Sequence, residues 1–301
     1  MDYTRPLGNP MSLPAKPTTF PPHHLIHHEA MKTTYSLRLS TEDESLANSL
    51  ACECIHLIDE LEQKLSRYHE GGDVFRINHL QAGETLHISE QCHACLLLAM
   101  EAYLHTGGLF DPTLGTMIEH LKTGQDGTLP APVGQLTVHP DTPAVTCNAP
   151  GRVIDLGGIG KGFTLDQLKE LLSGHEIDGA LLSAGASTHL AIGDASWPID
   201  LSGAREVLRV DLKNEALSAS GTIIQGSHIV HPDAHGANQP DHAAQHAMIW
   251  SRSPTAAFAD AWSTALMLMS PEEIEQVASE ETSLSAVYVE NESGFQTYSA
   301  R

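Results

Sequence analysis

The stretch Asp155-Leu-Gly-Gly-Ile-Gly-Lys-Gly-Phe-Thr-Leu-Asp166, called the glycine loop below, sets closely spaced glycines and one lysine between two acids. Glycine adopts backbone angles and allows close approaches that other residues do not. A glycine-rich turn between an apolar strand and a helix leaves backbone N–H groups free to face a phosphate. The stretch therefore predicts an anion-facing loop, and the alternative is a tight strand-to-helix turn without any ligand.

Two common phosphate-binding motifs are excluded by the spacing. A P-loop needs Ser or Thr directly after Gly-Lys and a glycine five residues before that pair. Here Gly162 follows Lys161, and Asp155 stands where the first glycine should be. The dinucleotide fingerprint also fails, because Gly158, Gly160 and Gly162 are spaced two and two. A phosphate site in this loop would therefore be of another kind.

Three further motifs flank the glycine loop. Phe110-Asp-Pro-Thr-Leu-Gly115 precedes it, and His228-Ile-Val-His-Pro232 and Ala259-Asp-Ala-Trp-Ser-Thr-Ala-Leu266 follow it. In order and rough spacing, the four motifs resemble those of the ApbE family of FAD:protein FMN transferases. The likeness runs from about Met31 to the C-terminus, which is nearly the whole chain.

The resemblance implies an α+β fold in which a single large domain holds FAD in a cleft. It also implies Mg²⁺-dependent transfer of FMN from FAD to a Thr or Ser hydroxyl of an acceptor flavoprotein, with release of AMP. FAD would be the substrate, Mg²⁺ the cofactor and the acceptor the protein partner. Independently of the resemblance, helices and strands do not alternate strictly along the chain, and this favours α+β over a doubly wound fold.

Local patterns predict several elements. Polar and apolar side chains alternate along residues 33–39, and this pattern predicts a strand. Thr41-Glu-Asp-Glu44 fits a capping box that opens a long helix with apolar side chains at three- and four-residue spacing. Residues 152–156 are expected to form a strand that leads into the glycine loop. Further helices are expected near residues 89–106, 110–122, 161–172, 255–269 and 271–279, and further strands near 180–185, 284–290 and 295–298.

The charge of the chain limits its partners. The 301 residues carry 16 Lys and Arg against 38 Asp and Glu, a net charge of -22. Nucleic-acid binding needs clustered cations, and none cluster along this sequence. No apolar run approaches the roughly 18 residues that a membrane helix needs. With so few cations, a pyrophosphate would need backbone N–H groups, helix N-termini and a divalent metal.

The N-terminal residues 1–29 are rich in Pro and His and are expected to be a disordered tail ahead of a domain over residues 30–301. This tail has no secretory pattern and no lipid-anchor cysteine, which predicts a cytoplasmic location. Five cysteines fit a reducing compartment. Cys92 and Cys95 have metal or redox spacing, but they lie in an apolar helix and are expected to be buried small hydrophobes.

Asp260 and Thr264 are four residues apart on an expected helix and therefore project from the same face. A carboxylate and a hydroxyl so placed can bind a hard cation such as Mg²⁺. Their spacing alone favours local roles over a metal site, since the acid can stabilise the helix dipole and the threonine can bond to the preceding turn. The resemblance favours the metal, with the backbone carbonyl of Gly160 as a further ligand.

The resemblance also assigns contacts to FAD. Phe110 and its neighbours lie where the family lines its flavin site, although Asp111 also suits a turn before proline. Tyr68 matches a family aromatic that stacks on a ring, and its alternative is a core residue at the end of a helix. The expected FAD-contacting residues are Met31, Tyr68, Leu109, Phe110, Asp111, Gly157, Phe163 and Val230, with Gly157 and Phe163 contributing largely through their backbone.

His228 is the expected general base, because the matching family histidine is implicated in catalysis. A neutral histidine beside the acceptor hydroxyl can take its proton near neutral pH. Asp260 is expected to serve catalysis through the metal. The resemblance makes His228 stand out among the nineteen histidines of the chain.

Four residues depart from the family pattern: Lys32, Ala186, Ala219 and His231. These departures motivate one alternative to the transferase, a flavin-binding protein that has lost catalysis. A second alternative is an FAD diphosphatase, in which water replaces the acceptor hydroxyl and FMN and AMP are released. The same metal and pocket would serve the diphosphatase and the transferase, so the sequence does not separate them.

Overall fold

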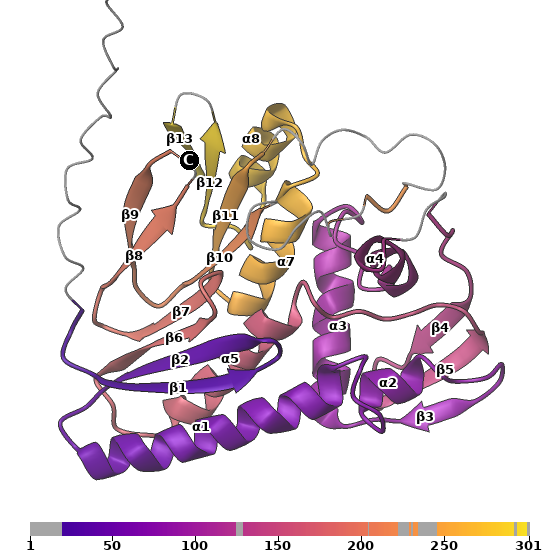
Figure 1. The fold of residues 1–301 in the computed structure, drawn as a ribbon, viewed down its shortest axis with the longest axis horizontal. Helices are drawn as coiled ribbons and strands as arrows, with labels where there is room; N and C mark the ends of the chain where they lie inside the picture. The colour runs from indigo at the N-terminus through magenta and orange to yellow at the C-terminus, as the bar shows by residue number, and fades with distance from the viewer. Residues whose placement is uncertain are drawn as a thin grey trace, which may run out of the picture.

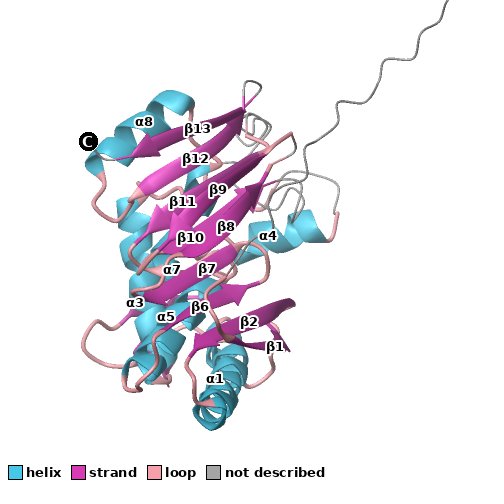
Figure 2. Cartoon of the chain, turned by 90° about the vertical axis from the view of Figure 1, so that its left-hand side faces the viewer, coloured by secondary structure: helices cyan, strands magenta, loops and turns pink. Residues whose placement is uncertain are grey.

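The structure is a computed structural model that describes residues 20–124, 129–203, 205–221, 229, 231–233, 246–291 and 294–299. Its centre is one eight-stranded sheet in which every neighbouring pair of strands is antiparallel (Figure 2). The strand order is β1 (His24–Ala30), β2 (Thr33–Ser40), β6 (Gly179–Ala184), β7 (Thr188–Gly193), β10 (Ala216–Gly221), β11 (Met248–Ser253), β12 (Ala286–Asn291) and β13 (Gly294–Ser299).

Helices cover one face of this sheet. They are α1 (Glu44–Leu65), α5 (Gly160–Ser173), α7 (Ala256–Leu266) and α8 (Pro271–Glu280), and α3 (Glu90–His105) packs on α7. The buried side of α7 is rich in alanine, and small side chains let this helix approach α5 and the sheet closely. This close packing brings the start of α5 and the middle of α7 together.

A two-stranded hairpin covers the opposite face of the sheet. It consists of β8 (Trp197–Ser202) and β9 (Val207–Leu212), which pair only with each other among the described residues. Trp197 is fully buried there. Because strand side chains alternate, Trp250 of β11 packs under this hairpin while Ile249 packs against the helices. The sheet is thus buried on both faces.

A smaller unit stands beside the helices, on the right of Figure 1. Its three-stranded sheet has the order β3 (Thr85–His87), β5 (Ala144–Ala149) and β4 (Gln135–Val138), and it carries the helices α2 (Asp73–Ile77) and α4 (Gly115–Lys122). The main chain returns from this unit through residues 152–156 into α5. The glycine loop therefore lies between the two sheets.

The expected α+β class is confirmed, and most expected elements are present. The predicted strand over residues 152–156 is wrong, since the segment makes a single bridge between Val153 and Leu114. The long helix is capped by Asp43, which accepts the N–H of Leu46 at 3.0 Å, rather than by Thr41. Side-chain caps compete within a few residues, so a sequence pattern alone does not choose between them.

The predicted boundary of the N-terminal tail also needs correction. Residues 24–29 belong to β1, where they pair with β2 and alternate between partly buried and exposed side chains. The pairing with β2 and this alternation show that residues 24–29 are part of the domain. The tail therefore ends before His24. The first 19 residues lie outside the described part of the chain.

The cysteines behave largely as expected. Cys92 and Cys95 are fully buried in α3, and burial raises the pKa of each thiol, so both remain protonated. Cys54 and Cys147 are buried too, while Cys52 is exposed on α1. Across the described stretches of the chain, no helix has both the length and the apolar composition needed to cross a membrane.

Candidate functional site

Two adjoining pockets lie at the glycine loop. The first, called the apolar pocket, has a volume of about 190 Å³, and its lining includes Leu109, Phe110, Asp111, Leu114, Ile118, Gly158, Ile229 and Thr264. The second, called the basic pocket, has a volume of about 520 Å³, and its lining includes Met31, Lys32, Glu62, Arg67, Tyr68, Gly160, Lys161, Ala186 and Ser187. Lys122, Asp155 and Gly157 line both pockets. The two pockets therefore form one divided cleft.

The glycine loop is held in place at both ends. Asp155 accepts the N–H of Gly157 at 2.8 Å, and the N–H of Gly160 bonds to the carbonyl of Leu156 at 2.7 Å, where α5 begins. Gly162 has no room for a side chain, because a Cβ there would collide with the backbone of Ala256 at the start of α7. Glycine at this position lets α5 and α7 meet.

Asp260 lies where α7 meets this loop, and its residue is only 4% exposed. Its Oδ2 accepts the N–H of Gly162 at 3.2 Å and lies 3.6 Å from Nζ of Lys161. Its Oδ1 accepts the hydroxyl of Ser218 at 3.2 Å. Thr264, one turn later, donates its hydroxyl to the Asp260 carbonyl at 3.3 Å and lines the apolar pocket. The structure thus joins the predicted metal pair to the glycine loop.

The donors at this point suit Mg²⁺. Asp260 supplies a carboxylate and Thr264 a hydroxyl, and Mg²⁺ prefers such oxygen ligands. The carbonyl of Gly160, the third expected ligand, accepts the hydroxyl of Thr164 at 2.9 Å. The Asp260 carboxylate already faces a positive charge, the ammonium of Lys161. Within the described parts of the chain no three His, Cys, Asp or Glu side chains gather at one point. A ligand set made of Asp260, Thr264 and Gly160 needs only one such side chain.

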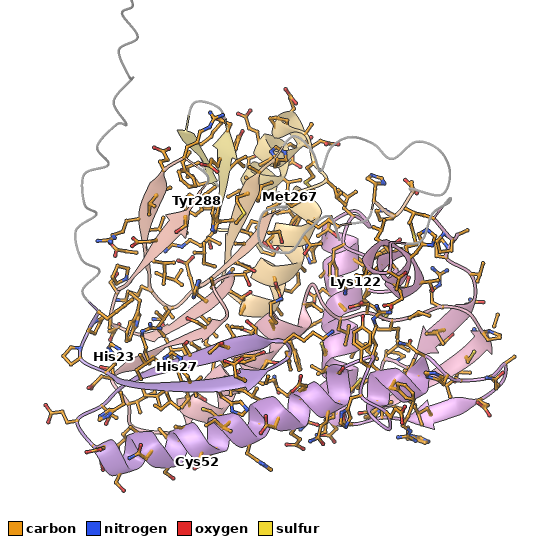
Figure 3. The ribbon with its side chains drawn as sticks, viewed as in Figure 1. His23, His27, Cys52, Lys122, Met267 and Tyr288 are labelled. Atoms are coloured by element: carbon orange, nitrogen blue, oxygen red, sulfur yellow. The ribbon has the colours of Figure 1, made fainter. Side chains whose placement is uncertain are left out.

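The basic pocket concentrates positive charge in an acidic protein. Lys32, Lys122, Lys161 and Arg67, four of the chain's 16 Lys and Arg residues, line it. Lys122 ends α4 and is labelled in Figure 3. The sequence shows no cluster of these residues because they come from four separate segments. Sequence analysis therefore missed Lys122, Arg67 and the cationic role of Lys32 and Lys161.

A partly buried histidine bonds to the turn that forms one wall of the basic pocket. His189 of β7 lies between the Ser183 hydroxyl, 2.8 Å from Nδ1, and the Ala186 carbonyl, 3.3 Å from Nε2. Burial lowers the pKa of His189 to about 4. The neutral ring donates from Nε2 to the carbonyl and accepts the hydroxyl at Nδ1. It holds the turn that carries Ala186 and Ser187 into the pocket.

Most predicted contact residues meet in the cleft. Leu109, Phe110, Asp111, Gly157 and Thr264 line the apolar pocket, and Met31, Tyr68, Gly157 and Gly160 line the basic pocket. Asp111 also makes the expected turn, since it accepts both the N–H and the hydroxyl of Thr113 at 2.7 Å.

The structure does not show the side chains of three predicted residues in the cleft. Phe163 is 1% exposed and packs in the core, so a contact with a ligand there involves only its backbone. His228 and Val230 lie outside the described residues. Ile229, the described residue between them, lines the apolar pocket.

Comparison with known proteins identifies the chain's relatives. The sequence model of the ApbE family matches residues 31–288. A protein of Klebsiella pneumoniae named FAD:protein FMN transferase is 24% identical over 90% of this chain and 85% of its own length. The flavin transferase ApbE from Vibrio cholerae superposes with a TM-score of 0.76 at 20% identity, over 93% of this chain and 98% of that one. The apo form of the flavinyl transferase ApbE from Pseudomonas stutzeri also superposes with a TM-score of 0.76. Its sequence identity is 21%, and the match covers 93% of this chain and 95% of that one.

Proposed function

Because this chain belongs to the ApbE family, we propose that it is an FAD:protein FMN transferase. An acceptor Thr or Ser oxygen attacks the FMN phosphorus of FAD, the phosphoanhydride bond to the AMP phosphate breaks, and AMP leaves with the electron pair of that bond. The hydroxyl proton passes to a base. FMN ends as a phosphoester on the acceptor protein.

The divided cleft suits the two halves of FAD. The apolar pocket offers the ring of Phe110 and several aliphatic side chains to the flavin. The larger basic pocket takes the AMP half, where cations face the phosphates. Asp155 and Gly157 line both pockets, so the pyrophosphate lies across the glycine loop. This adjacency of an apolar and a cationic pocket at one loop is the observation that carries the proposal.

Asp260, Thr264 and the Gly160 carbonyl would hold Mg²⁺ beside the pyrophosphate. When bound, the ion neutralises charge that builds on the phosphate oxygens as the bond to AMP breaks. Lys161 lies in the same place, with Nζ 3.6 Å from Asp260 Oδ2 and 3.4 Å from the Gly157 carbonyl. Its ammonium adds a second positive charge near the bond that breaks.

His228 remains the proposed base, as the resemblance implies. Its neighbour Ile229 lines the apolar pocket, where the flavin half brings its phosphate towards the shared loop. A neutral imidazole there would accept the proton of the acceptor hydroxyl as the new bond forms. His228→Ala is then expected to slow transfer while FAD binding persists, and unchanged transfer would mean that another group is the base.

The test measures AMP release and covalent FMN together. Purified protein receives FAD with Mg²⁺ or with EDTA, with and without an acceptor domain, and the acceptor mass is read in parallel. Acceptor-dependent AMP and an added FMN mass support the transferase. Free FMN and AMP without an adduct would identify a diphosphatase, and bound FAD without AMP would identify a protein that binds flavin and does not react.

A further inference from the structure

The tight turn between β1 and β2 has an unusual backbone. Ala30 pairs with Thr33, so Met31 and Lys32 form a two-residue loop. Both have positive φ, 51° and 58°. Such turns favour Asn-Gly, because a side chain on a left-handed residue crowds the backbone. A strained turn that contains neither preferred residue points to a role for the side chains that it presents.

Both side chains of this turn line the basic pocket. Other contacts fix the turn. Glu62 of α1 accepts the Met31 N–H at 2.7 Å, and the Met31 sulfur accepts the Tyr35 hydroxyl at 3.1 Å. These contacts of Met31 hold the turn beside the pocket, and the turn carries Lys32.

The Lys32 ammonium lies over the ring of Tyr68, 4.5 Å from the ring centroid. Tyr68 is 50% exposed, and cation–π contacts at exposed sites are weak. Among the described residues, no carboxylate comes within ion-pair distance of Lys32 or Lys122. A phosphate oxygen in the pocket would bind this ammonium more strongly than the ring does.

The charges that line the pocket leave Lys32 and Lys122 unneutralised. Arg67 pairs with Asp155 at 2.9 Å, and Lys161 faces Asp260. Glu62, the remaining carboxylate of the pocket lining, accepts a hydrogen bond from the turn itself. The positive charge available to a ligand therefore comes largely from these two lysines, which stand on different elements of the pocket wall.

We propose that Lys32 is a specificity residue for the phosphate of the AMP half, an inference that rests on the proposed function. In the empty pocket its ammonium rests on Tyr68. When a nucleotide enters, the ammonium leaves the ring and pairs with the phosphate, and the ring face of Tyr68 is freed for the ligand. Lys32 thus makes the basic pocket select phosphorylated ligands over the nucleoside.

Calorimetric titration with AMP, adenosine and inorganic pyrophosphate tests this role. Lys32→Met is expected to weaken AMP and pyrophosphate binding roughly 3- to 10-fold and to leave adenosine unchanged. The salt dependence of AMP binding should become shallower, because one cation is lost. Lys32→Arg keeps the charge and should bind like wild type. Lys213→Met is the matched control, since Lys213 pairs with Asp194 at 3.3 Å and lines neither pocket.

Lys32→Gly separates binding from folding. Glycine relieves the left-handed strain, so the melting temperature should rise by about 2 °C while AMP binding weakens as in Lys32→Met. A purely structural role would move both quantities in the same direction. AMP binding by Lys32→Met that equals wild type at every salt concentration would overturn the proposal, even if FMN transfer occurs. Wild-type protein that binds neither AMP nor pyrophosphate would also overturn this proposal, whereas the transferase is decided separately by the FMN mass added to the acceptor.

Discussion

Nε of Arg67 lies 2.9 Å from Oδ2 of Asp155, which joins the end of α1 to the start of the glycine loop. The same guanidinium reaches the Gly115 carbonyl at 3.2 Å and a Glu119 oxygen at 2.6 Å, both on α4. The side chains of Arg67 and Asp155 are only 9% and 10% exposed. One buried cation therefore ties three segments of the cleft together.

Arg67→Met is expected to destabilise the protein by about 3 kcal/mol, because Asp155 would remain as a buried charge without its partner. Urea unfolding measures the loss. Arg76→Met is the control, since Arg76 is 48% exposed and 3.9 Å from its acid, and it should cost less than about 1 kcal/mol. Adding Asp155→Asn should recover part of the loss. A double variant no more stable than Arg67→Met would contradict the buried-charge explanation.

Gly162→Ala is expected to cost about 3 kcal/mol, because the new Cβ meets the Ala256 backbone and forces α5 away from α7. Gly160→Ala two residues earlier is the matched control. Its Cβ would lie 3.9 Å from Leu156 Cβ, an ordinary contact, and alanine favours a helix, so stability should hold or rise. Thermal unfolding compares the two variants. Equal losses would show that the α5–α7 contact is not the cause.

Asp260→Ala is expected to reduce Mg²⁺-dependent AMP release at least roughly 100-fold while the protein stays folded. The variant removes the only carboxylate of the proposed ligand set. Asp194→Ala, which removes a fully exposed carboxylate that pairs with Lys213, should leave the rate unchanged. The rate of AMP release is measured across a Mg²⁺ titration for both variants, and circular dichroism checks that each is folded. Wild-type rates in Asp260→Ala would remove the metal assignment.

Asp166 of α5 accepts the N–H groups of Ala256 and Ala257 at 2.9 and 2.8 Å, at the start of α7. Burial nevertheless raises its pKa from 3.8 to about 6. The folded state therefore holds this proton more tightly than the unfolded state. Stability from this group is complete below pH 4 and falls by about 3 kcal/mol as pH rises through 6.

Asp166→Asn lacks this titration, so its free energy of unfolding relative to wild type should rise between pH 4 and 6. Urea unfolding of both proteins across that range isolates the group from the other acids of the chain. A constant difference across the range would show that Asp166 titrates at its ordinary value in the folded protein.

Local patterns identified much of the fold and part of the site. The helix periodicities, the glycine loop and the spacing of Asp260 and Thr264 are properties of short segments, and the structure brings the last two together at α5 and α7. The predictions from the sequence were wrong where local signals compete or are weak. Residues 152–156 include Val153, Ile154 and Leu156 and look like a strand, but among the described residues their one β-bridge joins Val153 to Leu114.

The sequence by itself determined the family, because four short motifs in order resemble it, and that resemblance predicts the oxygen donors beside the glycine loop. Only the tertiary structure decided that Lys32, Lys122, Lys161 and Arg67 face one pocket of an acidic protein. Those residues come from a hairpin turn, from α4, from the start of α5 and from the end of α1. Their meeting depends on how these elements pack against each other, and no spacing along the chain encodes that packing.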